Sequence, residues 1–461
     1  MRKLLAILFF VALSFSDTID TSQVKSMNVT FTVKGTIAIN GGNIISAYGN
    51  ISVPQATDYQ ITKYSGRSAV DSNGNLYALI QAPNPSNPFT VTITTTVLTT
   101  GRTTKDLPAS YTVPYEEVKY TMVTDRVQSN SPEIKELAMR ITENCTDNFE
   151  RIAKISRYVH DWVEYDLSYA GQWKDAVWVL DNRRGVCVEY ATLFAALTRS
   201  LGIPARIIGG YAYDGSERAM IGHAWNEVYI GKWVPVDPLW DEIGYLDGGH
   251  VETARVIDKE IPDDIGATYS GGSATIITST SNPTYKSKTT PKNVSYFEKF
   301  KDYNITSVNV TSGNSTDIEL VLNPVEYRVI NVKLISHCSD AVTVDGGTKM
   351  LILEQGRTTK ASWNLKSNNM GKYQEYNCSI SLESEYLEAR DIPVSINAPK
   401  TDAVANKSTD PGQTVTPPGT EPLTGQPVTT VTETDKKPGL CPFFFVLLTL
   451  AAASFYRKSK E

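Results

Sequence analysis

The sequence predicts a multidomain protein in which a mixed α+β segment lies between two all-β sandwich modules, followed by a C-terminal transmembrane helix. Residues 17–115 and 293–400 alternate polar and apolar side chains with the period of two that strands require. Residues 116–270 add apolar positions at helical spacing, and residues 439–456 are almost entirely apolar. The length of 461 residues also favours roughly three domains, at about 150 residues each.

The composition excludes several classes of function. The formal net charge is -6 at pH 7 and no basic face is evident, so we expect no nucleic-acid partner. No Cys/His cluster has zinc spacing and no Asp-rich loop resembles an EF-hand, so we expect no metal and no cofactor.

The N-terminus, residues 1–16, is predicted to be a signal peptide. Arg2 and Lys3 precede an apolar run over residues 4–13, and small residues then allow cleavage after Ser16. The run is too short to span a bilayer well, which favours a cleaved peptide over an anchor.

The C-terminus is predicted to tether the protein to a membrane. Residues 401–438 form a Thr/Pro-rich stalk that cannot bury enough apolar surface to fold. The transmembrane segment at 439–456 follows, and the basic tail 457–461 would stay cytoplasmic. The stalk, the apolar run and the basic tail together resemble the C-terminal sorting signals of archaeal surface proteins, although Leu440 stands where those usually have Phe. We therefore expect a single-pass cell-membrane protein with its folded part outside the cell.

The first module, residues 17–115, is predicted to be a β-sandwich. The run 29–33 alternates Val and Phe with Thr, and Gly41, Gly42, Pro54 and the segment 71–75 punctuate such runs as turns.

The middle segment, residues 116–270, is predicted to begin with two helices. Ile134, Leu137, Ala138 and Ile141 recur at helical spacing, and a second helix is expected over about 147–165 with Thr146 as its N-cap.

The second β module, residues 293–400, follows a predicted Ser/Thr-rich linker at 271–292. Cys338 and Cys378 both lie in this module, and we expect them to form a disulfide in an exported protein. Trp363 between them is suggestive of an immunoglobulin-like core, with a longer spacing than in true immunoglobulin domains.

Candidate glycosylation sites concentrate outside the middle segment, as expected for an exported glycoprotein. The Asn-x-Ser/Thr acceptors are Asn28, Asn50, Asn144, Asn293, Asn304, Asn309, Asn314, Asn377 and Asn406.

Cys187 is predicted to begin a buried helix. Gly185 allows a tight turn before it, the following residues are good helix formers, and Gly202 and Pro204 end the helix in the usual order. Backbone N–H groups at a helix N-terminus favour a thiolate and could also bind an oxyanion. The alternative is a small buried core cysteine, which is a common use of this residue.

His223 opens one strand-like run and Asp237 ends the next, which is a base-and-orienter arrangement for nucleophilic catalysis. A two-residue turn at Gly231 and Lys232 would put the two side chains on opposite faces. A three-residue loop over 229–231 would place His223 directly opposite Asp237, and Gly231 suits its left-handed last position. The chemistry therefore requires an odd loop or a bulge here.

These residues resemble the core of the transglutaminase-like superfamily over about residues 116–245. The blocks that carry the resemblance are Gly185-x-Cys187; Gly202-Ile203-Pro204-Ala205-Arg206 with Gly210-Tyr211; His223-Ala224-Trp225; and Trp233-Val234-Pro235-Val236-Asp237-Pro238. The resemblance implies a papain-like fold with a Cys-bearing helix packed on an antiparallel sheet. The first module is similar to a β domain that often precedes such cores in microbial proteins.

The resemblance implies a triad of Cys187, His223 and Asp237 that acts on amide bonds of cell-surface proteins or peptides through a thioester, by crosslinking or by hydrolysis. The alternative is an idle surface adhesin or scaffold that uses the fold for binding. The family often adds a side chain to the oxyanion hole, for which the candidates are Trp162, Tyr165 and Gln172. Of the other histidines, His160 is expected at the surface or as a cap, whereas His250 and His337 have no evident partner.

Overall fold

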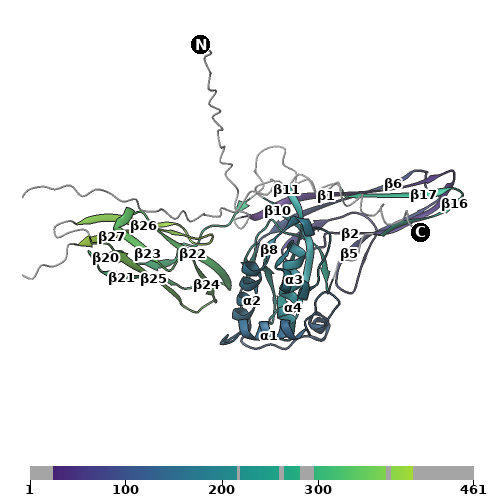
Figure 1. Cartoon of the computed structure of the whole chain (residues 1–461). Helices are drawn as coiled ribbons and strands as arrows, with labels where there is room; N and C mark the ends of the chain where they lie inside the picture. The colour runs from purple at the N-terminus through teal and green to yellow at the C-terminus, as the bar shows by residue number, and fades with distance from the viewer. Residues whose placement is uncertain (1–23, 215–218, 259–263, 281–294, 370–374, 398–461) are drawn as a thin grey trace, which may run out of the picture.

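The computed structural model describes residues 24–214, 219–258, 264–280, 295–369 and 375–397. Figure 1 shows a helix-containing core with one β module on each side of it. The predicted signal peptide, stalk, transmembrane segment and tail lie outside the described residues. Among the residues that are described, no helix is long and apolar enough to cross a membrane.

The N-terminal module consists of two sheets, ordered β17-β1-β6-β3 and β16-β2-β5-β4. Ile37, Ile51, Ile80 and Ile93 are among the buried apolar side chains of its own core. The strands are β1 (Val24–Asn40), β2 (Asn43–Val53), β3 (Gln60–Lys63), β4 (Ser68–Val70), β5 (Leu76–Pro83), β6 (Phe89–Thr100), β16 (Asp264–Ser270), β17 (Ser273–Thr280) and β18 (Ser295–Tyr296).

The predicted boundary between core and linker is wrong. Strand β16 pairs with β2, and β17, which lies inside the predicted linker, pairs with β1 over eight residues. Both strands therefore complete the N-terminal sandwich after the chain has built the core. Strand β17 lies at the edge of its sheet, where Ser and Thr are tolerated, so its composition resembled that of a linker.

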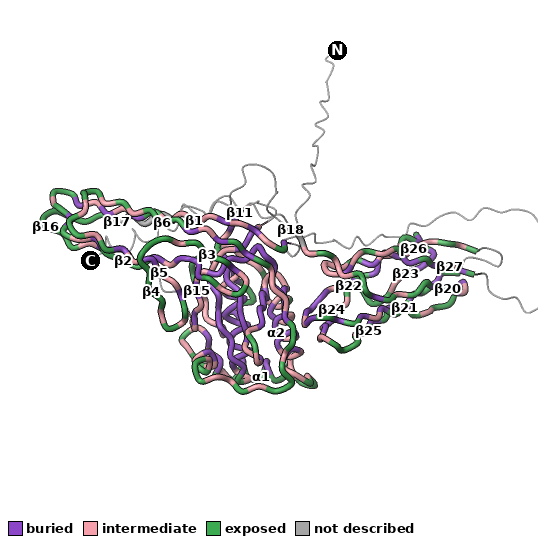
Figure 2. The backbone as a smooth tube through the Cα atoms, turned by 180° about the vertical axis from the view of Figure 1, so that it is seen from behind, coloured by how far each residue is buried: buried purple, intermediate pink, exposed green. Residues whose placement is uncertain are grey.

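The core packs four helices on an antiparallel sheet of order β13-β12-β11-β10-β15. This arrangement agrees with the papain-like fold that the family resemblance implied. Figure 2 shows that this region is the most continuously buried part of the chain. Its elements are α1 (Pro132–Ile141), α2 (Asn148–Trp162), α3 (Ala176–Asn182), α4 (Cys187–Ser200), β10 (Ala205–Asp214), β11 (Ala219–Tyr229), β12 (Trp233–Asp237), β13 (Glu242–Ile243) and β15 (Val251–Val256).

Short elements complete the core. A 3-10 helix, η2 (Tyr115–Thr121), precedes α1, and another, η3 (Leu167–Tyr169), precedes α3. Strand β8 (Glu164–Tyr165) pairs in parallel with β9 (Arg184–Gly185), while β14 (Tyr245–Leu246) pairs with β7 (Arg102–Thr103) of the N-terminal region.

The second helix begins one residue later than predicted at its cap. Asp147, not Thr146, is the N-cap of α2, and its side chain accepts the Glu150 backbone N–H at 2.9 Å. Thr146 instead donates its own backbone N–H to the Glu150 carboxylate at 2.9 Å. Asp147 and Thr146 together therefore make the two reciprocal contacts of a capping box with Glu150.

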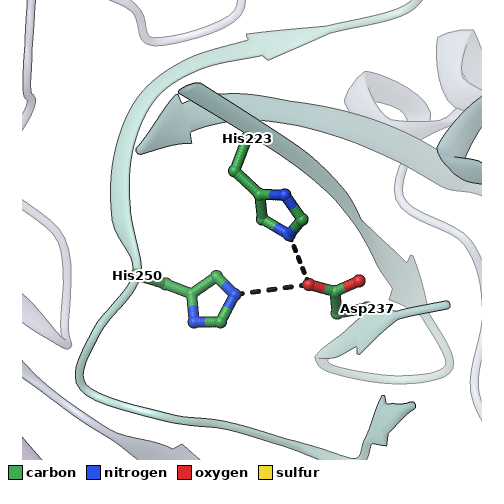
Figure 3. Close-up of side chains that lie close together, drawn as sticks. All are labelled: His223, Asp237 and His250. Atoms are coloured by element: carbon green, nitrogen blue, oxygen red, sulfur yellow. Dashed lines mark hydrogen bonds and ion pairs between the residues drawn. The ribbon is translucent and has the colours of Figure 1, made fainter. Parts of the chain in front are cut away.

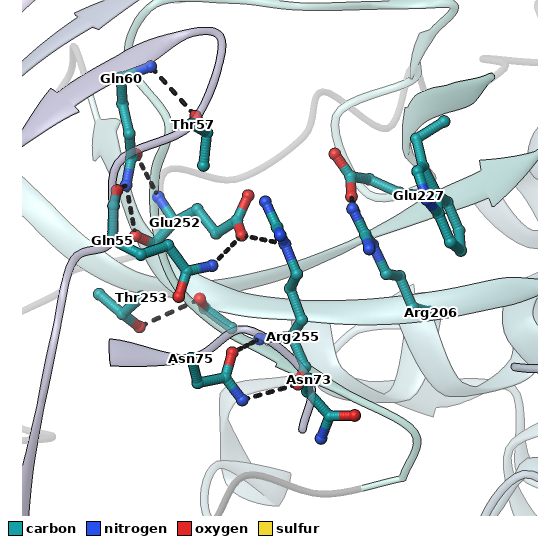
Figure 4. Close-up of polar contacts among 12 residues, drawn as sticks. Gln55, Thr57, Gln60, Asn73, Asn75, Arg206, Glu227, Glu252, Thr253 and Arg255 are labelled. Atoms are coloured by element: carbon teal, nitrogen blue, oxygen red, sulfur yellow. Dashed lines mark hydrogen bonds and ion pairs between the residues drawn. The ribbon is translucent and has the colours of Figure 1, made fainter. Parts of the chain in front are cut away.

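A cluster of buried ion pairs lies where the N-terminal region meets the core. Arg206 donates to the Glu227 carboxylate at 2.6 Å, and Arg102 approaches the same carboxylate from strand β7. On the neighbouring strand Arg255 pairs with Glu252 at 2.6 Å (Figure 4). Burial opposes the ionisation of Glu227, but the two guanidinium groups lower its pKa to about 2.

The turn predicted at residues 71–75 is part of this junction. The Asp71 carboxylate accepts the backbone N–H groups of Asn73 and Asn75, and the Asn75 side chain accepts the Arg255 backbone N–H at 2.6 Å. Lys119 of η2 donates to the Asn73 side chain at 2.9 Å. The turn therefore connects the first module to β15 and η2 of the core through hydrogen bonds.

The C-terminal module also has two sheets, ordered β19-β21-β25-β23 and β20-β27-β26-β22-β24. Its elements are β19 (Tyr303–Ile305), β20 (Val308–Thr311), β21 (Ser315–Leu322), β22 (Arg328–Ser336), η4 (Ser339–Ala341), β23 (Val342–Asp345), β24 (Lys349–Leu353), β25 (Thr359–Ser367), β26 (Tyr376–Glu383) and β27 (Arg390–Asn397).

Cys338 and Cys378, the pair expected from the sequence, form a disulfide. Cys338 follows β22 and Cys378 lies on β26, and these strands are neighbours in one sheet. The bridge therefore lies within a sheet, whereas the immunoglobulin disulfide joins two sheets. Trp363 is buried in the same core as Cys338 and donates its indole N–H to the Gly347 carbonyl at 3.0 Å.

Most of the candidate glycosylation sites that the structure describes are accessible. Asn28 is half-buried, and Asn293 and Asn406 lie outside the described residues. The exposed acceptors are Asn50, Asn144, Asn304, Asn309, Asn314 and Asn377. Glycosylation stays a prediction.

Candidate active site

Cys187 is the first residue of α4, and it is half-buried and free. Cys145, the other free cysteine among the described residues, is also half-buried. The helix behind Cys187 is buried almost throughout and contacts β11 and the other three helices, so the position of the thiol is set by the core itself. Gly202 follows the helix with a φ of 76°, the left-handed conformation expected of a helix-ending glycine.

The turn before Cys187 is held by Glu189, a fully buried residue whose importance the sequence did not reveal. Its carboxylate accepts the backbone N–H groups of Val186 and Lys174, each at 2.9 Å. A Cβ on Gly185 would lie 2.3 Å from the Glu189 Cβ, so glycine is required there by the side chain that folds over it.

His223 and Asp237 lie on the same face of the sheet. Strands β11 and β12 are joined by the three-residue loop 230–232, with Tyr229 paired to Trp233 and Asn226 to Val236. The odd loop agrees with the expectation, but it is one residue further along than the loop 229–231. The next step of the ladder brings Asp237 level with Trp225 rather than directly opposite His223, and side chains two residues apart share a face.

The two side chains form a buried ion pair. The His223 Nε2 lies 2.6 Å from the Asp237 Oδ2, and both residues are buried (Figure 3). Burial disfavours the charged imidazole, but Asp237 and the neighbouring Cys187 thiol outweigh it and raise the pKa of His223 to about 10. Burial also opposes the ionisation of Asp237, yet the His223 imidazole holds its pKa well below the usual range.

Backbone and aromatic groups fix this pair. The Asp237 Oδ1 accepts the N–H groups of Leu239 and Trp240 at 2.9 and 3.1 Å. The Trp240 indole stacks on the His223 ring at a centroid distance of 4.6 Å, and Trp225 stacks on it at 5.9 Å. These contacts restrict the His223 and Asp237 side chains to few rotamers.

The structure separates the three oxyanion-hole candidates. The Trp162 indole N–H donates to the Leu180 carbonyl at 3.0 Å, and the Gln172 side-chain amide donates to the Ser168 carbonyl at 2.8 Å. The single Trp162 donor and one of the two Gln172 N–H groups are therefore engaged elsewhere. Tyr165 lies on β8 and pairs with Gly185, two residues before Cys187, so its strand runs beside the nucleophile turn.

His250 has partners that the sequence did not reveal. It is buried, its Nε2 lies 3.3 Å from the Asp237 Oδ2, and its Nδ1 lies 2.7 Å from the Asp247 Oδ1. The expectation that His250 lacks a partner is therefore wrong. The short run Asp247-Gly248-Gly249-His250 was the only local signal, and only the sheet brings His250 to Asp237.

The remaining two histidines are also engaged. The His160 Nδ1 lies 3.2 Å from the Pro238 carbonyl oxygen, close to Asp237 in the chain. The His337 Nε2 lies 2.9 Å from the Ser381 Oγ in the C-terminal module, so its expected lack of a partner is wrong as well. Pairing across the β22–β26 sheet supplies that contact.

Among the residues that the structure describes, two overlapping sets of buried side chains have the residue types of metal ligands. Within each set the donor atoms lie within 4.8 Å of one another. The sets are His223, Asp237 and His250, and Glu242, Asp247 and His250. The first set was not evident from the sequence because its members come from β11, β12 and the loop before β15, whereas the second set lies within residues 242–250 but lacks the Cys/His spacing of a zinc site.

Comparisons with known proteins cover the region that contains these residues. Residues 135–238 match the family model described as the transglutaminase-like superfamily. The chain is 28% identical over 129 residues to an uncharacterized protein of Mycobacterium leprae, covering 26% of this chain and 43% of that protein. It is 32% identical over 102 residues to a protein-glutamine gamma-glutamyltransferase of Pseudomonas aeruginosa, covering 19% of this chain and 15% of that protein. The chain thus spans less than half the length of each of these relatives.

Two solved structures are similar to this one. A candidate cysteine protease from Cytophaga hutchinsonii shares 19% identity at a TM-score of 0.41, covering 60% of this chain and 99% of that chain. The periplasmic domain of TgpA from Pseudomonas aeruginosa shares 18% identity at a TM-score of 0.29, covering 48% of this chain and 88% of that chain.

Proposed function

We propose that this chain, whose residues 135–238 belong to the transglutaminase-like superfamily, is a thiol enzyme that acts on amide bonds of cell-surface proteins or peptides through a Cys187 thioester. The observation that carries the proposal is the buried 2.6 Å contact between His223 and Asp237, beside a free thiol at the N-terminus of α4. A charged pair of this kind is costly to bury, and such pairs cluster at functional sites.

The proposed mechanism uses the three side chains in fixed order. The Cys187 thiolate attacks the amide carbonyl, and backbone N–H groups at the start of α4 stabilise the oxyanion that forms. His223 gives its proton to the departing amine as the thioester forms. Asp237 holds the imidazole with its Nε2 engaged, which leaves Nδ1 for the thiol and the amine.

The acceptor of the acyl group decides the outcome. A second amine gives a crosslink, and water gives hydrolysis by a peptidase, isopeptidase or deamidase. The name of the Pseudomonas aeruginosa relative, a protein-glutamine gamma-glutamyltransferase, supports acyl transfer from glutamine as the first reaction to test. An idle adhesin or scaffold would need neither the ion pair nor a free thiol next to it.

The test is an incubation of the full chain with a glutamine-containing protein and a biotin-labelled primary amine, followed by mass spectrometry. Amine incorporation by the wild type indicates a transglutaminase, and water-derived products indicate an amidase or peptidase. Cys187→Ala should abolish either product, whereas Cys145→Ala should leave it unchanged because Cys145 has no place in the triad. Equal product with wild type and Cys187→Ala would contradict the proposal.

We also propose that the enzyme is exported and tethered by residues 439–456, on the evidence of both termini. Deleting residues 438–461 should then release soluble protein into the medium. Retention of the truncated chain in the membrane fraction would contradict the single-anchor proposal.

A further inference from the structure

The Asp237 carboxylate is shared between two histidines. Its Oδ2 lies 2.6 Å from the His223 Nε2 and 3.3 Å from the His250 Nε2 (Figure 3). Its Oδ1 accepts two backbone N–H groups, those of Leu239 and Trp240. Because a carboxylate has about four acceptor positions, His250 completes the coordination of Asp237.

His250 is itself held in one orientation. Its Nδ1 lies 2.7 Å from the Asp247 Oδ1, which also accepts the Gly249 backbone N–H at 2.9 Å. The ring is in aromatic contact with Trp240 and Trp225, at centroid distances of 5.0 and 5.1 Å. Its two nitrogens therefore face two carboxylates, and both can carry a proton.

Most of the titratable groups around His250 are acidic. Besides Asp237 and Asp247, Glu242 lies with a carboxylate oxygen 4.0 Å from the His250 Nδ1, and the His223 ring centroid lies 5.6 Å away. Burial, together with the neighbouring Asp247, raises the pKa of Glu242 well above its usual value. Burial also raises the pKa of Asp247, although its hydrogen bond with His250 opposes this.

The His250 ring lies between the carboxyl groups of Asp237 and Asp247. Burial disfavours the charged form of His250, but its hydrogen bonds with Asp237 and Asp247 raise its pKa to about 9. An imidazolium that contacts acidic side chains on both sides avoids the cost of an unpaired buried ion.

We propose that His250 is a positioning residue of the active site: its imidazolium holds the Asp237 carboxylate in place and takes part of its charge. The inference rests on the proposed function, because it assigns His250 a place in that triad. Because the His250 imidazolium neutralises part of the charge of the Asp237 carboxylate, Asp237 stabilises the proton on His223 less strongly. His223 can then give this proton to the departing amine more readily than a simple His–Asp pair would allow.

The first experiment follows the histidine protons in the full chain labelled with 15N only at histidine. In the wild type, His223 and His250 should both be imidazolium at pH 7. In His250→Gln, which keeps an N–H donor but removes the charge, the proton affinity of His223 should rise about tenfold, or one pKa unit. His337→Gln, which alters an exposed histidine of the C-terminal module, should leave His223 unchanged. A neutral His250 in the wild type, or an unchanged His223 titration in His250→Gln, would overturn the proposal.

The second experiment measures the iodoacetamide alkylation of Cys187 by mass spectrometry. His250→Gln and Asp247→Asn should each slow this alkylation about tenfold at pH 6, because an Asp237 carboxylate that is no longer held in place misorients the His223 imidazolium beside the thiol. If His250→Gln does not fold, Asp247→Asn and the wild-type spectra still decide the matter. Rapid, His223-dependent labelling that neither variant alters would overturn the positioning role alone. Labelling of Cys187 that is no faster than that of Cys145 and insensitive to His223→Ala would overturn the proposed function instead.

The overlap with a metal-like donor set is tested on the same samples. Elemental analysis of the purified wild-type chain should find no stoichiometric transition metal, and Asp247→Asn should give the same result. A metal bound by Glu242, Asp247 and His250 would overturn the proposal, because it would occupy the Nδ1 that the ion pair with Asp247 requires.

Discussion

The Trp240 indole lies over the His223 imidazole, with 4.6 Å between the ring centroids and 20° between the ring planes. The next residue, Asp241, has a φ of 59° and turns away to the junction with the C-terminal module. There it pairs with Arg157 at 2.5 Å and accepts a hydrogen bond from Asn331 at 2.9 Å. One short segment thus contacts both the base of the active site and a neighbouring module.

Removing the stack should loosen His223. We expect Trp240→Ala to slow alkylation of Cys187 at pH 6 about tenfold, because stacking and cation–π contact with an imidazolium contribute about 1–2 kcal/mol. Trp240→Phe keeps an aromatic ring over His223, so its alkylation rate should stay within about threefold of the wild-type rate. Equal rates in Trp240→Ala and the wild type would show that the stack does not orient the base.

The triad should make Cys187 more reactive than Cys145. Burial raises the pKa of Cys145, whereas Cys187 has an imidazole beside it. Iodoacetamide at pH 6 should therefore label Cys187 first, His223→Ala should remove that advantage, and Asp237→Asn should keep the fold but misorient the imidazole. Preferential labelling of Cys145 in the wild type would contradict this ordering.

Stability should depend on pH through His223. Its pKa is raised from 6.5 to about 10 on folding, so the stability it contributes is fully present below pH 6.5 and is lost as pH rises through about 10. The pKa of Asp237 is lowered from 3.8, so its contribution is present above that value and is lost only in stronger acid. Urea unfolding should therefore show the largest difference between the wild type and His223→Gln from about pH 4 to 6.5, since 3.8 and 6.5 bound that window. A difference that stays constant from pH 6 to pH 10 would argue against a charged pair.

The junction with the C-terminal module should be sensitive to Arg157. Arg157→Ala leaves the mostly buried Asp241 carboxylate without its cation, so we expect a loss of about 2 kcal/mol in the free energy of unfolding. Arg357→Ala breaks an exposed pair with Glu354 and should cost less than about 0.5 kcal/mol. Similar losses in the two variants would mean that the junction contributes little. Slower Cys187 alkylation in Arg157→Ala would show that the loss of this ion pair also displaces the neighbouring Trp240 from His223.

The disulfide should stabilise the C-terminal module. It closes a loop with a sequence separation of 40, so the paired change Cys338→Ser and Cys378→Ser should lower the free energy of unfolding by about 4 kcal/mol. Cys145→Ser leaves the bridge intact and serves as the control. Alkylation of Cys187 should persist in the doubly substituted chain, because the bridge is remote from the core. Unchanged unfolding without the bridge would contradict the expectation.

Much of this protein could be predicted from local patterns. The resemblance to the transglutaminase-like superfamily is confirmed by the match over residues 135–238. The helix that begins at Cys187 was predictable because the signals that start, bury and end a helix lie within a few turns of it. Parity also showed that His223 and Asp237 could share a face only across an odd loop or a bulge, since side chains alternate along a strand.

Other features depend on pairings between distant segments. Strands β16 and β17 return to the first module only because β2 and β1 offer open edges more than 200 residues earlier in the chain. A Ser/Thr-rich edge strand also has the composition of a linker. The loop between His223 and Asp237 was placed one residue early because register is set by partners across the sheet.

The sequence by itself determined which residues form the helix and hairpin of the site, and that Cys187, His223 and Asp237 follow in the order of the family. Only the tertiary structure decided that His250 meets Asp237, that Trp240 covers His223, and that Glu189 holds the nucleophile turn. The physical reason is the range of the interactions. Periodicity and capping act over a few residues and leave a trace in composition, whereas a contact between two strands leaves no trace in either strand alone.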